Sequence, residues 1–170
     1  QDATQGALDI LLGALTKNSS TKEGSESLDQ ALTQDHDGSL LESITTLLKW
    51  EKPSGISEKT INGEKILKHI LNDKTDIAAE SISKEVGIDK GKALSLLIKL
   101  APIMLAMLGK IKKETWSDAQ GISRILQETT KKEKWNNNKF INLATKILDQ
   151  DGDGSMVDDL LWMAGKYFGK

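Results

Sequence analysis

The stretch KGKALSLLIKLAPIMLAMLG, residues 90–109, decides the fold. Almost every position after Lys92 is apolar, so a helix here has no polar face to turn toward water. Such a helix lies at the centre of a core or in a membrane. The unbroken apolar run after Lys99 is about ten residues, whereas roughly 20 are needed to span a bilayer. We therefore expect a central helix that the other segments surround. A kink is expected at Pro102, which lacks an amide donor and clashes with the carbonyl of Ile98.

The segments on both sides of this stretch have the 3.6-residue spacing of amphipathic helices. No segment alternates with period two for long enough to predict a sheet. The sequence therefore predicts an all-α, compact multi-helical domain of roughly eight or nine helices. We expect one domain over residues 1–170, with possible sub-units 1–114 and 115–170. Apolar faces are expected in residues 7–15, 28–32, 40–48, 61–71, 122–126 and 140–148, and a last helix over 156–168.

Residues that cap helices mark where these segments begin and end. Capping boxes are read at Asp2, Ser39, Ser117 and Ser155, each with an acid or glutamine three residues later. Thr21 and Asp89 are expected to begin further helices, Gly87 to end one, and Lys131 to Asn138 to form a polar connection.

Composition excludes several classes of protein. Hydrophobic residues make up 38% of the chain and 14 glycines add to them, so wholesale disorder is excluded. The absence of cysteine excludes disulfides, thiolate metal sites and cysteine catalysis. A net charge of -2 gives no general reason to expect nucleic acid or an acidic membrane as partner. Gln1 in place of methionine predicts a processed or truncated chain, and the compartment stays open, with the cytoplasm favoured over the periplasm.

Two segments of the chain resemble each other. Residues 32–42 and 148–158 both contain D-x-D-G-S followed by two apolar residues and an acid. A duplicated helix–loop–helix explains the match, and so do two independent turns that need the same glycine and the same cap.

Three further runs carry a resemblance to a known family. The runs DHDGSLL (35–41), GEKILKHIL (63–71) and LAPIM (100–104), the last followed by LG at 108–109, resemble the YidB-like bacterial family of unknown function. The likeness covers about residues 5–168 and is weaker between 110 and 138. It implies a compact helical domain in bacteria and transfers no catalytic residue.

An acidic loop near the C-terminus is the one candidate ion site. Alternating acids occupy positions 1, 3 and 5 of an EF-hand-like loop, and a glycine at position 6 allows the sharp bend. Calcium is the cofactor that this pattern implies. The candidate ligands are Asp149, Asp151, Asp153, Ser155, Asp158 and Asp159.

The loop also departs from that pattern. Position 12 is Leu160 instead of glutamate, so Asp158 or Asp159 would have to close the coordination shell. We expect affinity in the roughly millimolar range. The alternative is an acidic turn without an ion, in which the carboxylates lie at the start of the last helix and Ser155 caps it.

Other motifs fail on chemical grounds. Residues 87–93 have glycines too close together for a phosphate loop. Residues 77–97 have the outline of a helix-turn-helix, but the second helix offers no Arg, Asn or Gln to read bases. The basic stretch 110–146 is explained by a solvated face or, less well, by a phosphate-facing patch. His36 and His69 belong to no catalytic constellation.

The sequence therefore predicts a non-enzymatic bacterial structural or interaction domain, which calcium bound at residues 149–159 would stabilise. The alternative is a helix-turn-helix-like nucleic-acid-binding protein. An unidentified protein partner or a homo-oligomer is compatible with the sequence, nucleic acid is disfavoured, and no transmembrane segment is expected. The apolar tail 160–168 is either a docked core helix or a partner surface.

Overall fold

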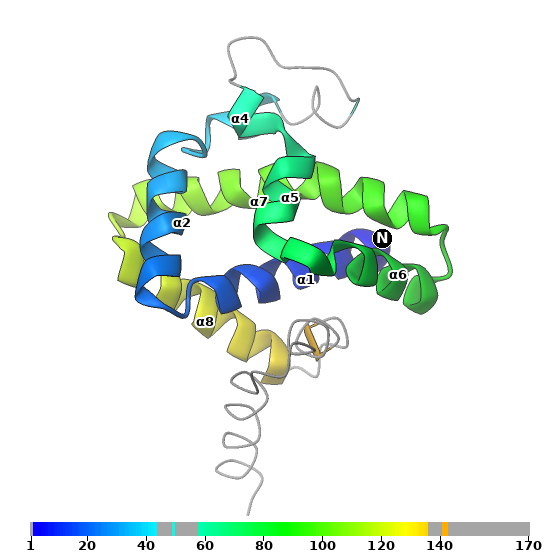
Figure 1. The fold of residues 1–170 in the computed structure, drawn as a ribbon. Coiled ribbons are helices and arrows are strands. Elements are labelled where there is room, and N and C mark those ends of the chain that lie inside the picture. The colour runs from blue at the N-terminus through cyan, green and yellow to red at the C-terminus, as the bar shows by residue number, and fades with distance from the viewer. Residues whose placement is uncertain (1, 44–48, 50–57, 136–140, 143–170) are drawn as a thin grey trace, which may run out of the picture.

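The computed structural model describes residues 2–43, 49, 58–135 and 141–142 (Figure 1). All regular structure within these residues is helical, which confirms the all-α prediction. The α-helices are α1 (Asp2–Asn18), α2 (Lys22–Gln34), α4 (Glu58–Ile61), α5 (Gly63–Leu71), α6 (Thr75–Val86), α7 (Lys90–Thr115) and α8 (Ala119–Trp135). Two 3-10 helices, η1 (Ser39–Ser43) and η2 (Asn72–Lys74), complete the described elements.

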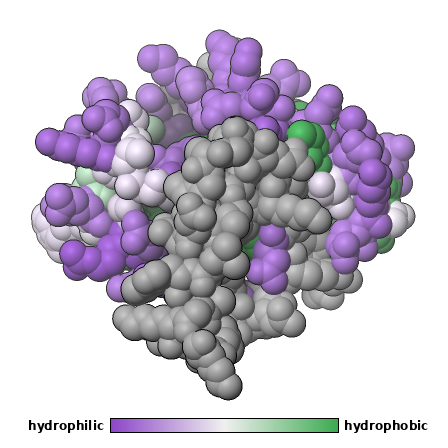
Figure 2. Space-filling view, turned by 60° about the horizontal axis from the view of Figure 1, so that its bottom comes forward, coloured by the Kyte–Doolittle hydropathy of each residue, from purple (hydrophilic) through white to green (hydrophobic). Residues whose placement is uncertain are grey.

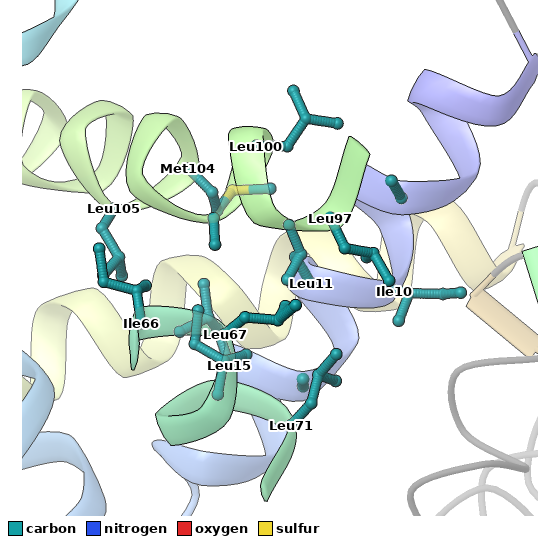
Figure 3. Packing of buried hydrophobic residues seen from close by; sticks show 14 of the residues in the cluster. Ile10, Leu11, Leu15, Ile66, Leu67, Leu71, Leu97, Leu100, Met104 and Leu105 are labelled. Atoms are coloured by element: carbon teal, nitrogen blue, oxygen red, sulfur yellow. The ribbon is translucent and has the colours of Figure 1, made fainter. Parts of the chain in front are cut away.

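Helix α7 is the centre of the arrangement, as the sequence predicts. It crosses the whole molecule in Figure 1 and packs against α1, α2, α5, α6 and η1. Figure 3 shows part of the core, where side chains from α1, α5 and α7 meet. Those labelled there are Ile10, Leu11, Leu15, Ile66, Leu67, Leu71, Leu97, Leu100, Met104 and Leu105. The helix runs without a break through the buried Pro102, and its expected kink stays a prediction.

Of the described helices, α7 is also the one long and apolar enough to cross a membrane. In its most apolar 18-residue window, 56% of the residues are buried inside the fold. A core helix meets the same criteria of length and composition, so this property carries little weight.

Several predicted caps are confirmed. Thr21 Oγ1 accepts a hydrogen bond of 3.0 Å from the amide of Gly24 at the start of α2. Asp89 Oδ2 accepts one of 2.9 Å from the amide of Gly91 at the start of α7. Gly87 ends α6 in the left-handed region, with φ of 78°. These short-range signals fixed the bounds of α2, α6 and α7 because a cap depends only on neighbouring residues.

Two predicted capping boxes are wrong by one or two residues. A nearby aspartate accepts the amide in each case: Asp37 Oδ1, two residues before Ser39, accepts from the amide of Ser39 at 3.0 Å. At α8, Asp118 Oδ1 accepts from the amide of Gly121 at 2.8 Å, while the Ser117 hydroxyl pairs with Thr115 instead. The amide binds the carboxylate instead of the serine hydroxyl because a charged acceptor forms a stronger hydrogen bond.

Two predicted segment limits also change. Asn62 divides the helix expected from Ile61 to Leu71, because its Oδ1 accepts from the amide of Lys65 at 3.1 Å and begins α5. The polar connection expected from Lys131 to Asn138 is helical as far as Trp135, so α8 includes this first part of it. The helices expected over 140–148 and 156–168 lie outside the described residues, except for Ile141 and Asn142.

Candidate functional site

The predicted calcium ligands Asp149, Asp151, Asp153, Ser155, Asp158 and Asp159 all lie outside the described residues. The related turn at residues 35–39 is described, and there Asp37 serves local structure. Asp37 binds the amide of Ser39 with one oxygen and Lys113 Nζ, at 3.3 Å, with the other. These bonds hold the pKa of Asp37 below its usual value. In the part of the chain that the structure describes, no three metal-ligating side chains gather.

This turn packs directly on α7. Gly38 adopts a φ of 99° and lies beside the backbone of Lys110. A Cβ on Gly109 would lie 1.8 Å from the carbonyl oxygen of His36, so only glycine permits the approach. Gly63 plays the same part between α5 and α7, since its Cβ would lie 2.0 Å from the carbonyl oxygen of Ile98. The separate runs that resemble the bacterial family therefore meet at α7.

The His36 side chain is buried by this packing, with 5% of its surface exposed. Its Nδ1 has no hydrogen-bond partner among the described residues. Burial lowers the pKa of His36 from 6.5, and the neighbouring Asp35 and Asp37 oppose the shift only in part. The neutral ring is therefore the form that the fold accommodates.

A pH dependence of stability follows from this burial. Because the folded pKa of His36 is lowered, the unfolded chain binds more protons below about pH 6.5. We expect the free energy of unfolding to fall as pH drops from 6.5 through the folded pKa of His36, and this contribution to level off below it. Urea unfolding between pH 7.5 and pH 4.5 measures the effect.

The two histidines provide matched variants for this test. His36→Gln should remove the pH dependence in that window, whereas His69→Gln should keep it because His69 is exposed on α5. Equal pH profiles for the wild type and His36→Gln would show that the buried ring does not cause the effect. The titration of Asp37 lies in a separate window, below about pH 4.

A second feature is the turn between α7 and α8, residues 112–121, which we call the α7–α8 corner. Trp116 ends α7 there with φ of 54° and ψ of 34°, in the left-handed region. Its side chain is 94% exposed. Among the described residues the other exposed large hydrophobic side chain is Met107, at 45%. A bulky residue in this backbone region is unusual, since helices commonly place glycine there.

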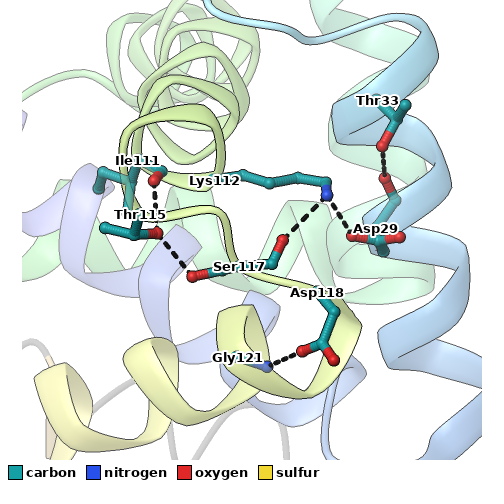
Figure 4. Close-up of polar contacts among 8 residues, drawn as sticks. All are labelled: Asp29, Thr33, Ile111, Lys112, Thr115, Ser117, Asp118 and Gly121. Atoms are coloured by element: carbon teal, nitrogen blue, oxygen red, sulfur yellow. Dashed lines mark hydrogen bonds and ion pairs between the residues drawn. The ribbon is translucent and has the colours of Figure 1, made fainter.

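Polar contacts fix the α7–α8 corner around Trp116 (Figure 4). Lys112 Nζ lies 3.0 Å from the carbonyl oxygen of Ser117 and 3.0 Å from Asp29 Oδ1 on α2. The amides of Trp116 and Ser117 both donate to the carbonyl of Lys112, and the hydroxyls of Thr115 and Ser117 lie 2.6 Å apart. The corner is therefore tied both to itself and to α2.

The described residues on the face of the molecule in Figure 2 are mostly polar. In Figure 2 the described residues around the grey atoms are mostly hydrophilic, and hydrophobic ones form only small spots. Isolated apolar residues are normal on a protein surface, so Trp116 stands out by its backbone conformation as much as by its exposure.

The helix-turn-helix outline falls on α6 and α7. The turn is present, with Gly87 between the helices. However, Ala93 and Leu97 of the second helix are fully buried in the core, and Lys90 lies 3.5 Å from Asp76. In a helix-turn-helix the second helix enters the DNA groove. Here that helix is α7, which the other helices surround, so this geometry disfavours DNA binding.

These features define a class: a compact helical protein built on one apolar helix, with glycines where the 35–39 turn and α5 meet it. Residues 1–111 match the sequence profile of the family described as "Bacterial protein of unknown function (DUF937)". The chain belongs to this bacterial family, as its resemblance to the YidB-like proteins predicts. No curated protein and no solved structure matches the chain.

Proposed function

We propose that this chain is a non-enzymatic bacterial interaction module and that Trp116 is its main contact with a protein partner. The observation that supports the proposal is the exposed indole on a left-handed backbone at the α7–α8 corner. That conformation costs an L-residue about 1–2 kcal/mol. Because the indole is 94% exposed, the fold recovers little of this cost by burying it. Tryptophan is enriched among the residues that dominate protein interfaces.

The surroundings of Trp116 favour rigid presentation. The ion pair of Lys112 with Asp29 is partly buried, with side-chain exposures of 20% and 30%. It joins the corner to α2, so a partner would meet an indole whose backbone is already fixed. Such preorganisation reduces the entropy that binding has to offset.

Trp116→Gly should raise the stability of the isolated protein. Glycine adopts the left-handed cap without the steric cost, so the free energy of unfolding should rise by about 1 kcal/mol. Thermal unfolding followed by circular dichroism measures this. A loss of stability of similar size would show that the indole serves the fold, and would contradict the proposal.

A photo-crosslinking residue at position 116 tests the interaction in bacterial cells. We expect a discrete crosslinked product from position 116 and none from position 92, which is exposed at the other end of α7. Mass spectrometry of the product distinguishes a second copy of this chain from another protein. Trp116→Gly should lose the same partner in co-purification while keeping its fold. Identical crosslinking from both positions, or an unchanged partner in Trp116→Gly, would overturn the proposal.

We also infer from the sequence that residues 149–159 bind calcium weakly, since acids at positions 1, 3 and 5 precede a glycine. Trp162 follows Asp159 by three residues and should sensitise terbium luminescence. We expect emission that saturates with terbium, falls when calcium competes in the roughly millimolar range, and disappears in Asp151→Ala. Asp35→Ala, in the related turn, should leave it unchanged. Emission that Asp151→Ala retains would refute binding at this loop.

A further inference from the structure

A polar hollow lies between the start of α2 and the first half of α8. Its volume is about 410 Å³, and its lining comes from residues 19–26 and 119–127. Small-molecule pockets have volumes of roughly 300–1,000 Å³, so a compact ligand fits by size. Such pockets are usually apolar, whereas serine, glutamine and charged side chains dominate this lining. The hydroxyl, amide and charged groups of these side chains favour a ligand that can form hydrogen bonds.

Buried hydroxyl contacts hold the sides of the hollow together. The Thr16 and Thr130 hydroxyls lie 2.7 Å apart between α1 and α8. Ser123 Oγ of α8 donates to the carbonyl of Ser19 at 2.8 Å, just before α2. These contacts join segments more than 100 residues apart, so the hollow is formed by the fold before any ligand binds.

The charged groups in the lining have no ion-pair partner in the part of the chain that the structure describes. Lys22 from α2 and Arg124 from α8 both line the hollow, and neither forms an ion pair within the described residues. By contrast, Lys84, Lys110 and Lys113 each lie within 4.0 Å of an acid. Arg124 is the single arginine of the sequence, and the guanidinium group is the side chain best suited to bind a carboxylate or phosphate in two places. Glu26 is the one acid in the lining, so the net charge there is positive.

One amide at each of the two helix starts is already capped by a side chain. Thr21 accepts from Gly24 and Asp118 accepts from Gly121, so the lining side chains provide most of the remaining polar groups. The buried hydroxyls of Ser25 and Ser123 donate to backbone carbonyls. Ser123 Oγ also accepts from Gln127 Nε2 at 3.3 Å, whereas the Ser25 oxygen is left able to accept. A ligand that carries an oxyanion together with hydroxyl or N–H donors would satisfy both sets of groups.

We propose that this hollow is a binding site for a small oxyanion, held by Arg124 and Lys22 through a carboxylate or phosphate group. The hollow does not include Trp116, so the loss of either function leaves the other testable.

Amide NMR titration at constant ionic strength tests the site, with inorganic phosphate and acetate as separate probes. We expect saturable shifts confined to residues 19–26 and 119–127 with at least one probe. The stronger probe identifies the class of oxyanion. Arg124→Gln should weaken binding by about tenfold or more, since it removes a charge-assisted contact.

Two variants make the test specific. Lys131→Gln changes the net charge equally, two turns further along α8 and outside the hollow, and should leave the affinity within about twofold. Glu26→Gln removes the one acid from the lining and should strengthen binding several-fold. Circular dichroism checks that each variant is folded. Absence of saturable shifts with both probes, or equal weakening by Arg124→Gln and Lys131→Gln, would overturn the proposal.

Discussion

Gly109→Ala is expected to lower the free energy of unfolding by about 3 kcal/mol or more, the high end for overpacking. The added Cβ would lie 1.8 Å from the carbonyl oxygen of His36 and 3.1 Å from the carbonyl carbon of Asp37. Both are backbone atoms, so no side chain can rotate away. The 35–39 turn would have to move off α7, and the buried Leu40 follows it directly. Urea and thermal unfolding measure the loss, which should reduce the melting temperature by about 10 °C.

Gly91→Ala is the matched control, because it places the same methyl group on the same helix. There the Cβ would meet only the carboxylate oxygen of Asp89 that caps α7, at 2.8 Å, and the end of that side chain can shift at the cost of part of the cap. We expect a change within about 1 kcal/mol, since alanine also favours the helix. If Gly109→Ala were as mild as Gly91→Ala, the close contact between α7 and the turn would be refuted.

The sequence predicts the central helix correctly because its signal is local and strong. An apolar run with no polar face has to be surrounded, and the neighbouring segments have stripes that can surround it. Caps such as Thr21 and Asp89 are predictable for the same reason. The caps predicted at Ser39 and Ser117 are wrong because an aspartate lies within two residues of each serine, and the spacing alone does not say which side chain accepts the amide.

The contacts between distant segments could not be predicted in this way. Gly63 and Gly109 belong to the runs that resemble the family. Glycine is needed at these positions because the backbones of Ile98 and His36, which are remote in sequence, come close to them. A glycine inside a helix signals a cost to helix stability, and only the packed structure names the backbone that comes close.

Some functional features could be predicted from the sequence and others could not. The acidic loop at residues 149–159 is a sequence pattern, and its calcium binding stays a prediction. The α7–α8 corner and the polar hollow were not predicted. For Trp116 a signal existed: an aromatic residue between a lysine-rich helix end and the Ser-Asp pair before the next helix. For the hollow the only signal was that Arg124 is the single arginine of the sequence. This alone does not predict a binding site, because only the structure shows that Lys22 lines the same hollow.

Leu97→Ala tests whether α7 is held by the core or owes its apolar character to a membrane. Leu97 is fully buried in α7, and its removal should cost about 2–5 kcal/mol in urea unfolding without detergent, through lost contacts and the cavity left behind. Met107→Ala is the control: it removes a side chain of similar size from the same helix, but one that is 45% exposed, so we expect less than about 1 kcal/mol. If α7 is a core helix, Leu97→Ala destabilises the protein much more than Met107→Ala does. If α7 lies in lipid, the two variants do not differ in this way. Equal, small effects of both variants, or a protein that stays dispersed only in detergent, would contradict the central place of α7.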